Sequence, residues 1–160
     1  MIRVLKCCMA CSIKLDCLFL EKMDRVKVEV DLGEKAWQVN VSARKHEWYI
    51  DEPEDMGGSD SGATPSEMVF AGLGACTAIT CKMYAQRKNW PLKDVHVVLE
   101  LLEKEAKSDG QFTRIMRQIV FEGPLDEAQK DRLLQIAGLC PVAKMLKGSI
   151  EIESSWINQK

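Results

Sequence analysis

Alternating apolar and polar positions predict strands in the part of the sequence that follows Met23. Valines alternate with charged residues over 26–30, and the alternation resumes over 37–41 after a turn at Gly33. Side chains two residues apart point to the same face of a strand. We therefore expect a hairpin with one buried face, extended by a third strand over 46–50.

A loop and a helix start follow these strands. Residues 51–63 are rich in Gly, Asp and Ser, a composition typical of a loop, and the segment is long enough to line a site. Thr64 can cap the amide three residues on, and Pro65 suits the first helical position. Glu67 can reach back to complete a capping box. The sequence therefore predicts that a helix begins at this point.

The predicted helix is apolar on nearly every side. From Met68 to Ala85 almost all residues are apolar or small, and Lys82 is the only charge. A helix with so little polar face is expected to be buried on most sides. Its glycines, threonines and lysine make it a poor transmembrane segment, so we expect a central core helix. Small residues on both sides of Cys76 would let another backbone approach closely there.

The second half of the sequence predicts another long hairpin, two helices and a last strand. Apolar residues alternate over 95–101 and again over 115–121, where Arg117 shares the apolar face, across a turn at 108–110. Asp126 with Gln129 can cap an amphipathic helix that Gly138 closes. A short helix should run from Cys140-Pro141 to about Lys147, followed by a strand over 150–152. This order predicts an α+β fold with mainly antiparallel sheets.

Composition narrows the class of protein. The 160 residues are 46% hydrophobic and 29% charged, which fits one domain with a sizeable core. The formal net charge is −2, and positive and negative residues alternate without a basic face, so we expect no nucleic-acid partner. The seven cysteines are an odd number, and Lys14 and Asp16 break the apolar run near the start. These features favour a reducing cytoplasm, without a membrane segment.

The first 22 residues differ from the rest. Four cysteines crowd into a stretch without a helical or strand period, namely Cys7, Cys8, Cys11 and Cys17. Cys8 and Cys11 have the spacing of a zinc-binding or dithiol pair, but a structural zinc site needs a second pair of ligands. We interpret 1–22 as a disordered or non-native leader and 23–160 as a single domain.

Two later cysteines have contexts that suggest thiol chemistry. Cys140 precedes Pro141 at a predicted helix start, where unpaired amides and the helix dipole favour a thiolate. Cys76 lies inside the apolar helix, where burial raises the pKa of a thiol unless a cation or donor lies beside it. Both could equally be small buried apolar residues. From the residues alone, both interpretations stay open.

The segment from Gly57 to Cys76, together with Leu139-Cys140-Pro141-Val142, resembles the OsmC/Ohr family of thiol-dependent hydroperoxide reductases. The similarity runs from about Met23 to Ile152 and is nearest to the broad OsmC-like branch often called redox proteins. It implies an intertwined homodimer, in which sheets wrap around paired central helices and the site lies at the subunit interface. No metal or organic cofactor is implied.

The resemblance also implies a reaction. The cysteine that matches Cys76 attacks a small organic hydroperoxide and becomes a sulfenic acid, and the one that matches Cys140 condenses with it to a disulfide. A dithiol such as a lipoyl group then reduces the disulfide. The resemblance thus reverses the order of reactivity that the local electrostatics of the two cysteines suggest.

Two positions depart from the family pattern. Active peroxidases carry a glutamate directly after the helix-opening proline, to hold a catalytic arginine over the thiolate. Here that position is Ser66, and the acid is displaced to Glu67, about 100° around the helix. Glu67 could therefore serve only as a capping residue. Arg44, at the turn into the third strand, is the candidate cation, although a solvated surface arginine explains it equally well.

Other residues offer weaker chemistry. Cys81 lies about 140° around the helix from Cys76 and should pack in the core. His46 and His96 occupy polar positions on strands without a third partner, so a metal site or a Cys-His hydrolase is not supported. We therefore expect an organic hydroperoxide reductase. The alternatives are a non-enzymatic module that binds a small molecule or acyl ligand, and a thiol redox sensor.

Overall fold

The computed structural model of the chain describes residues 26–107 and 110–156. The chain divides into two compact units, Met1–Pro65 and Ser66–Lys160, and each unit is described by itself. The leader predicted over 1–22, with its four cysteines, lies outside the described residues. The prediction of a single domain over 23–160 stays a prediction.

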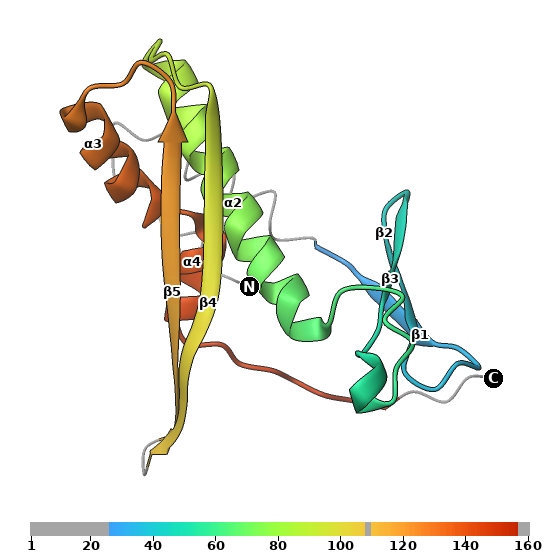
Figure 1. Cartoon of the computed structure of the whole chain (residues 1–160). Helices are drawn as coiled ribbons and strands as arrows, with labels where there is room; N and C mark the ends of the chain where they lie inside the picture. The colour runs from blue at the N-terminus through green and yellow to red at the C-terminus, as the bar shows by residue number, and fades with distance from the viewer. Residues whose placement is uncertain (1–25, 108–109, 157–160) are drawn as a thin grey trace, which may run out of the picture. The chain divides into compact units, whose positions relative to one another are not determined.

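The smaller unit contains a three-stranded antiparallel sheet. Its strands are β1 (Glu29–Leu32), β2 (Val39–Ala43) and β3 (His46–Ile50), in the order β1-β2-β3 (Figure 1). In the register, Val41 lies opposite both Val30 and Trp48. The three strands expected from the alternating pattern are therefore confirmed.

The expectation of a buried face on the first hairpin is wrong for the single chain. The side chains of Val30 and Leu32 are 58% and 66% exposed, and Val28 is exposed as well. Val41 is the buried apolar residue of this sheet. A three-stranded sheet needs a layer packed on its face before alternation leads to burial. The alternating pattern correctly predicts the strands, but it does not show whether another layer covers their apolar face.

The predicted loop over 51–63 is organised by one buried carboxylate. Asp51 accepts hydrogen bonds from the backbone amides and hydroxyls of Ser59 and Ser61, at 2.7–3.1 Å, and from the Glu52 amide at 2.8 Å. The Ser59 hydroxyl is the largest of the causes that lower the pKa of Asp51 well below its usual range. The loop also contains a 3-10 turn, η1 (Glu54–Met56).

The larger unit consists of a long helix, a long hairpin and two shorter helices. Its elements, in chain order, are α2 (Pro65–Arg87), β4 (Asp94–Lys107), β5 (Gly110–Glu122), α3 (Glu127–Ala137) and α4 (Pro141–Lys147). β4 and β5 pair antiparallel, and α2 runs alongside β4 (Figure 1). An α+β fold with antiparallel sheets is thus confirmed.

The ends of the helices follow the predicted signals. α2 begins at Pro65, and α4 begins at Pro141 directly after Cys140. Before α3, the Asp126 carboxylate accepts from the Gln129 amide at 2.7 Å, and the Gln129 side chain accepts from the Asp126 amide at 3.1 Å. This capping box satisfies two amides that would otherwise lack partners.

Two apolar clusters hold the larger unit together. The first joins α2, α3 and the hairpin through the buried residues Cys81, Ala85, Leu92, Leu125, Leu133 and Ala137. The second is formed by Leu73, Cys140 and Ala143, with Cys76, Leu99, Val142 and Leu146 packed against them. The inward side chains of β5 alternate as the sequence predicts, with Ile119 and Phe121 against the first cluster.

Within the chain, α2 is buried along one stripe rather than on most sides. Its buried residues recur every fourth position, at Leu73, Thr77, Cys81 and Ala85. On other faces Val69 and Ile79 are 49% and 53% exposed. The expected burial is not met within a single chain, because one hairpin and two short helices cover only one side of α2. By length and hydropathy alone, this helix could also cross a membrane.

The predicted last strand is absent from the described residues. Residues 149–156 follow α4 without helix or strand, and Ile152 is 82% exposed. Alternating isoleucines favour a strand, but a strand also requires a neighbour to which its backbone can hydrogen-bond. Within the described chain this segment has no such neighbour.

Candidate active site

The structure brings Cys76 and Cys140 together, although they are 64 positions apart in the sequence. Cys76 lies in the middle of α2, and Cys140 lies at the residue that caps α4. Both belong to the second apolar cluster, in which Cys76 packs against the group formed by Leu73, Cys140 and Ala143. The Cys140 thiol lies close enough to act as a hydrogen-bond partner of Cys76. Both thiols are free.

The surroundings of Cys76 favour the neutral thiol. Burial is the main cause that raises its pKa to about 11, and the adjacent Cys140 thiol raises it further. The Val142 amide and the Thr80 hydroxyl act in the opposite direction, as hydrogen-bond donors to the sulfur. These two neutral donors do not offset the desolvation. In the larger unit as described, Cys76 therefore lacks a cation that would ionise it at neutral pH.

Cys140 is fully buried and serves as the N-cap of α4. Its sulfur accepts a hydrogen bond from the Ala143 amide at 3.5 Å. The cysteine thus fulfils the role usually taken by serine or aspartate at a helix start, which agrees with the predicted placement. The short helix fixes the direction of the sulfur toward α2 and Cys76.

Arg117 is a half-buried cation that was not predicted from the sequence as a site residue. It projects from β5 on the same face as Ile115 and Ile119, and its Nη1 donates to the Thr77 hydroxyl at 2.9 Å. Thr77 is fully buried and donates in turn to the Leu73 carbonyl at 2.8 Å. An arginine on an otherwise apolar strand face is a signal that could have identified it.

Cys81 packs in the core, as predicted from its position around the helix. It is fully buried, and its thiol donates to the Leu133 carbonyl at 3.6 Å. Burial raises its pKa to about 11, although the positive charge of Arg117 acts to lower it. Cys81 therefore belongs to the apolar cluster that joins α2 to α3.

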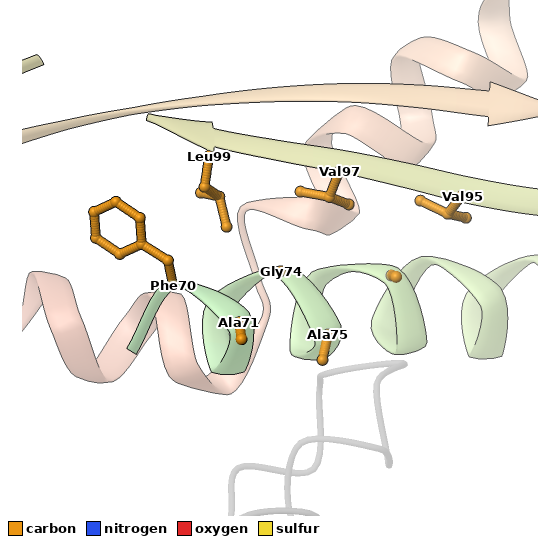
Figure 2. A pocket seen from close by; sticks show the side chains of 8 residues that line it. Phe70, Ala71, Gly74, Ala75, Val95, Val97 and Leu99 are labelled. Atoms are coloured by element: carbon orange, nitrogen blue, oxygen red, sulfur yellow. The ribbon is translucent and has the colours of Figure 1, made fainter. Parts of the chain in front are cut away.

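An apolar groove runs between α2 and β4, and one of its lining residues, Leu99, also packs against the cluster that contains the cysteine pair. Figure 2 shows Val95, Val97 and Leu99 of β4 pointing toward the helix, where Phe70 lies beside Leu99. The groove has a volume of about 370 Å³, and its helical wall is formed by Phe70, Ala71, Gly74, Ala75 and Ala78. A Cβ at Gly74 would lie 3.3 Å from Leu99 Cδ1, so the glycine allows this close approach. The groups that come close to Gly74 are side chains of β4, and the close approach of another backbone around Cys76 stays a prediction.

The remaining predicted residues lie at the start of α2 and in the smaller unit. Ser66 and Glu67 are exposed in the first turn of the helix. Arg44 is exposed at the turn between β2 and β3, with a positive φ of 59°. Left-handed backbone at a residue other than glycine stores strain, which often accompanies function. The roles of Arg44 and Glu67 toward Cys76 stay predictions.

Metal ligands do not gather within residues 26–107 and 110–156. No three side chains of His, Cys, Asp or Glu in those ranges are placed to hold a metal ion. His46 and His96 are both exposed on strands. The functional groups that do converge are the thiols of Cys76 and Cys140.

The chain is an α+β protein in which the central helix, α2, places Cys76 against Cys140 at the cap of α4. A model of the OsmC-like protein family matches residues 58–155, a range that includes both cysteines. The chain belongs to the OsmC-like family, which confirms the resemblance seen in the sequence. No curated protein matches the chain.

Solved structures of related proteins support the fold. An OsmC-like protein from Mycoplasma pneumoniae has a TM-score of 0.66 and 19% identity, over 78% of this chain and 88% of that one. An organic hydroperoxide resistance protein from Legionella pneumophila has a TM-score of 0.59 and 19% identity, over 78% and 90%. The corresponding protein OhrB from Bacillus subtilis has a TM-score of 0.55 and 18% identity, over 78% and 91%.

Proposed function

We propose that this protein reduces organic hydroperoxides through a cycle of two cysteines. The observation that carries the proposal is the contact between Cys76 and Cys140, which places two free thiols from distant parts of the sequence in one apolar cluster. Family membership supports the proposal, since proteins of the same fold are named organic hydroperoxide resistance proteins. Leu99 packs against the cysteine cluster and also lines an apolar groove, and an apolar lining suits an organic rather than an inorganic peroxide.

The proposed cycle begins at Cys76. Its thiolate attacks one peroxide oxygen, so that an S–O bond forms, the O–O bond breaks, and the alkoxide leaves and takes up a proton as the alcohol. The Cys140 thiol then attacks the sulfenic sulfur, an S–S bond forms, and the hydroxyl leaves as water once the thiol proton has joined it. A small dithiol, such as a lipoyl group, reduces the disulfide through two exchange steps.

Activation of Cys76 requires a cation in addition to its present neighbours. With a pKa of about 11, roughly one thiol in 10⁴ is ionised at pH 7. We propose that Arg44 supplies this charge, because its turn holds an exposed guanidinium at the cost of a left-handed backbone. A cation within a few ångströms favours the thiolate and lowers the pKa of the cysteine.

We also propose that the active form is a homodimer. Apolar side chains that single chains usually bury are exposed on three segments: β1, one face of α2, and the stretch after α4. A second copy could cover these surfaces and offer a strand neighbour to residues 149–156. Because each copy would offer the same surfaces, a twofold arrangement could cover both sets at once.

Stopped-flow kinetics with reduced protein and cumene hydroperoxide test the proposed reaction. The wild type should consume one peroxide and lose two thiols per chain. Cys76→Ser should abolish consumption, because it removes the attacking sulfur. Cys140→Ser should still react once, but it should stop at a sulfenic acid that a dimedone probe can trap.

Cys81→Ser is the matched control, since it changes a third cysteine on the same helix outside the pair. It should retain both the rate and the stoichiometry. If the wild type neither consumes peroxide nor loses two thiols, the proposed reduction is wrong. If Cys81→Ser has the same effect as Cys76→Ser, the assignment of the attacking residue is wrong.

A further inference from the structure

A second cavity in the larger unit has a composition unlike that of the groove beside β4. It lies between α2, β5 and α4 and has a volume of about 410 Å³, within the range of roughly 300–1,000 Å³ that is typical of small-molecule sites. Its apolar lining consists of Leu73, Ile115, Ala143 and Leu146. Its polar lining consists of Thr113, Arg114, Arg117 and Lys147.

The polar lining is cationic. Arg114 forms an ion pair with Glu103 at 3.4 Å, so its charge is largely balanced. Arg117 is half-buried and uses one of its donors on Thr77, which fixes the guanidinium at the wall of the cavity. Lys147 lies at the last turn of α4 with an exposed side chain. Of the described residues that line the cavity, none is acidic.

We propose that this cavity binds a small carboxylic acid with an apolar chain. The carboxylate would accept hydrogen bonds from the remaining donors of Arg117 and from the Lys147 ammonium. Such hydrogen bonds are strong because both partners are charged. The chain would lie on the leucine, isoleucine and alanine side chains and exclude water from them. Neither a bare anion nor an uncharged lipid uses both halves of this lining.

The position of the cavity connects it with the thiols. Leu73, Ala143 and Leu146 line the cavity and also form or contact the cluster around Cys140. A bound acid would therefore rest against the residues that enclose the cysteine pair. The binding itself requires no reaction at either thiol, so this inference does not depend on the proposed peroxide reduction.

Calorimetric titration of the reduced full chain with octanoate provides the test. Octanoate should bind saturably at one site per chain, and 1-octanol and acetate should each bind at least tenfold more weakly. Lys147→Met should weaken octanoate binding at least threefold. Lys88→Met, which removes an exposed lysine beyond the end of α2, is the control and should leave the affinity unchanged.

Arg117→Lys keeps the positive charge but loses the planar fork, so it should weaken binding at least fivefold. Circular dichroism should confirm that each variant keeps the helical signal of the wild type. Equal binding of octanoate and 1-octanol, tighter binding of inorganic phosphate than of octanoate, or equal affinity of Lys147→Met and Lys88→Met would each overturn the proposal. Absence of saturable binding would overturn it as well.

Discussion

The two units of this chain differ in how far each accounts for its own stability. The larger unit buries Cys81 and Leu133 completely and encloses the cysteine pair between α2 and α4. The smaller unit buries Val41 and the loop-organising Asp51, while valines of β1 stay exposed. The thiols are therefore positioned by a unit with a core of its own. The residue proposed to activate them belongs to the unit that has little core.

The residues that position the two thiols and the residue proposed to ionise Cys76 therefore belong to different units. Packing within residues 66–156 is sufficient to bring two sulfurs together, but the same packing desolvates Cys76 and raises its pKa to about 11. The proposed reaction would therefore need a charge from outside that cluster to ionise Cys76. The comparison between the units can be tested by changing each in turn.

The largest effect is expected from Arg44→Gly. Glycine tolerates the left-handed backbone, so the variant should gain about 1 kcal/mol in free energy of unfolding. Loss of the cation should lower the peroxide rate constant at pH 7 by about 10³-fold, because fewer Cys76 thiols are ionised. The rate constant should then rise tenfold per pH unit toward pH 11, whereas in the wild type it should level off near neutrality.

Lys45→Gly is the matched control, because it changes the neighbouring cation of the same turn. It should keep the rate constant of the wild type within about twofold, since an exposed charge is largely screened by solvent and salt. If Arg44→Gly reacts as fast as Lys45→Gly, another group activates Cys76, and the smaller unit loses its proposed role.

The next effect concerns the core of the larger unit. Leu133→Ala should lower the free energy of unfolding by about 2–5 kcal/mol, because it leaves a cavity where a leucine is fully buried. Leu134→Ala, at the exposed neighbouring position, should cost less than about 1 kcal/mol. Urea unfolding followed by circular dichroism provides both values. Similar losses at the two positions would contradict the description of the core.

The sequence predicts a helix or strand well where local residues determine it, and poorly where it must pair with or pack against a distant part of the molecule. Capping residues lie next to the elements they stop or start, so Asp126, Gln129 and Pro141 gave the bounds of α3 and α4 closely. The alternation at Ile150 and Ile152 gave a strand that the described chain does not form. Local patterns identify which residues can form an element or share a face, whereas pairing and burial depend on a neighbour that the pattern does not name.

The same limit applies to the candidate site: local motifs identified its cysteines, but not the contacts made by distant residues. The motifs around Cys76 and Cys140 selected the two thiols, and the fold brings them together. The sequence could not reveal Arg117 as a partner of Thr77, because that contact joins residues 40 positions apart through the packing of α2 on the hairpin. The alternating pattern does place Arg117 on an apolar strand face, and a charged residue at such a position is the one sign in the sequence that it has a buried partner.

A smaller loss of stability is expected from Thr77→Val. The substitution keeps the shape of the side chain but removes the hydroxyl that accepts from Arg117 Nη1. The guanidinium would be left with an unmatched donor at a half-buried position, so the free energy of unfolding should fall by about 1–2 kcal/mol. Thr113→Val, at an exposed position of β5, serves as the control for urea unfolding. Equal stability of the two variants would show that the bond has no net effect.

The smallest and most local effect is expected in the smaller unit. Asp51→Asn replaces an acceptor of five hydrogen bonds with an amide that cannot accept at both ends. The loop should open, and Glu-C protease should cut after Glu52 or Glu54 faster than in Asp55→Asn. The far-UV circular dichroism should hardly change. Slow cleavage equal to that of Asp55→Asn would contradict the role of Asp51.

The same loop should respond to acid in a defined direction. Because hydrogen bonds from Ser59 lower the pKa of Asp51 below its ordinary value of 3.8, the ionised carboxylate stabilises the folded loop. That contribution is fully present above pH 3.8 and is lost as the pH falls toward the lowered pKa. The protection against proteolysis that Asp51 provides should therefore persist at pH 5 and above.

The central claim is that Cys76 and Cys140 form a redox pair built by the larger unit. It is tested most directly by peptide mapping after one equivalent of cumene hydroperoxide is added to reduced protein without oxygen. We predict one disulfide-linked peptide that joins Cys76 to Cys140, while Cys81 is recovered as a free thiol after unfolding. A disulfide from Cys76 to any other cysteine, or a Cys76 sulfinic acid with Cys140 still reduced, would contradict the claim.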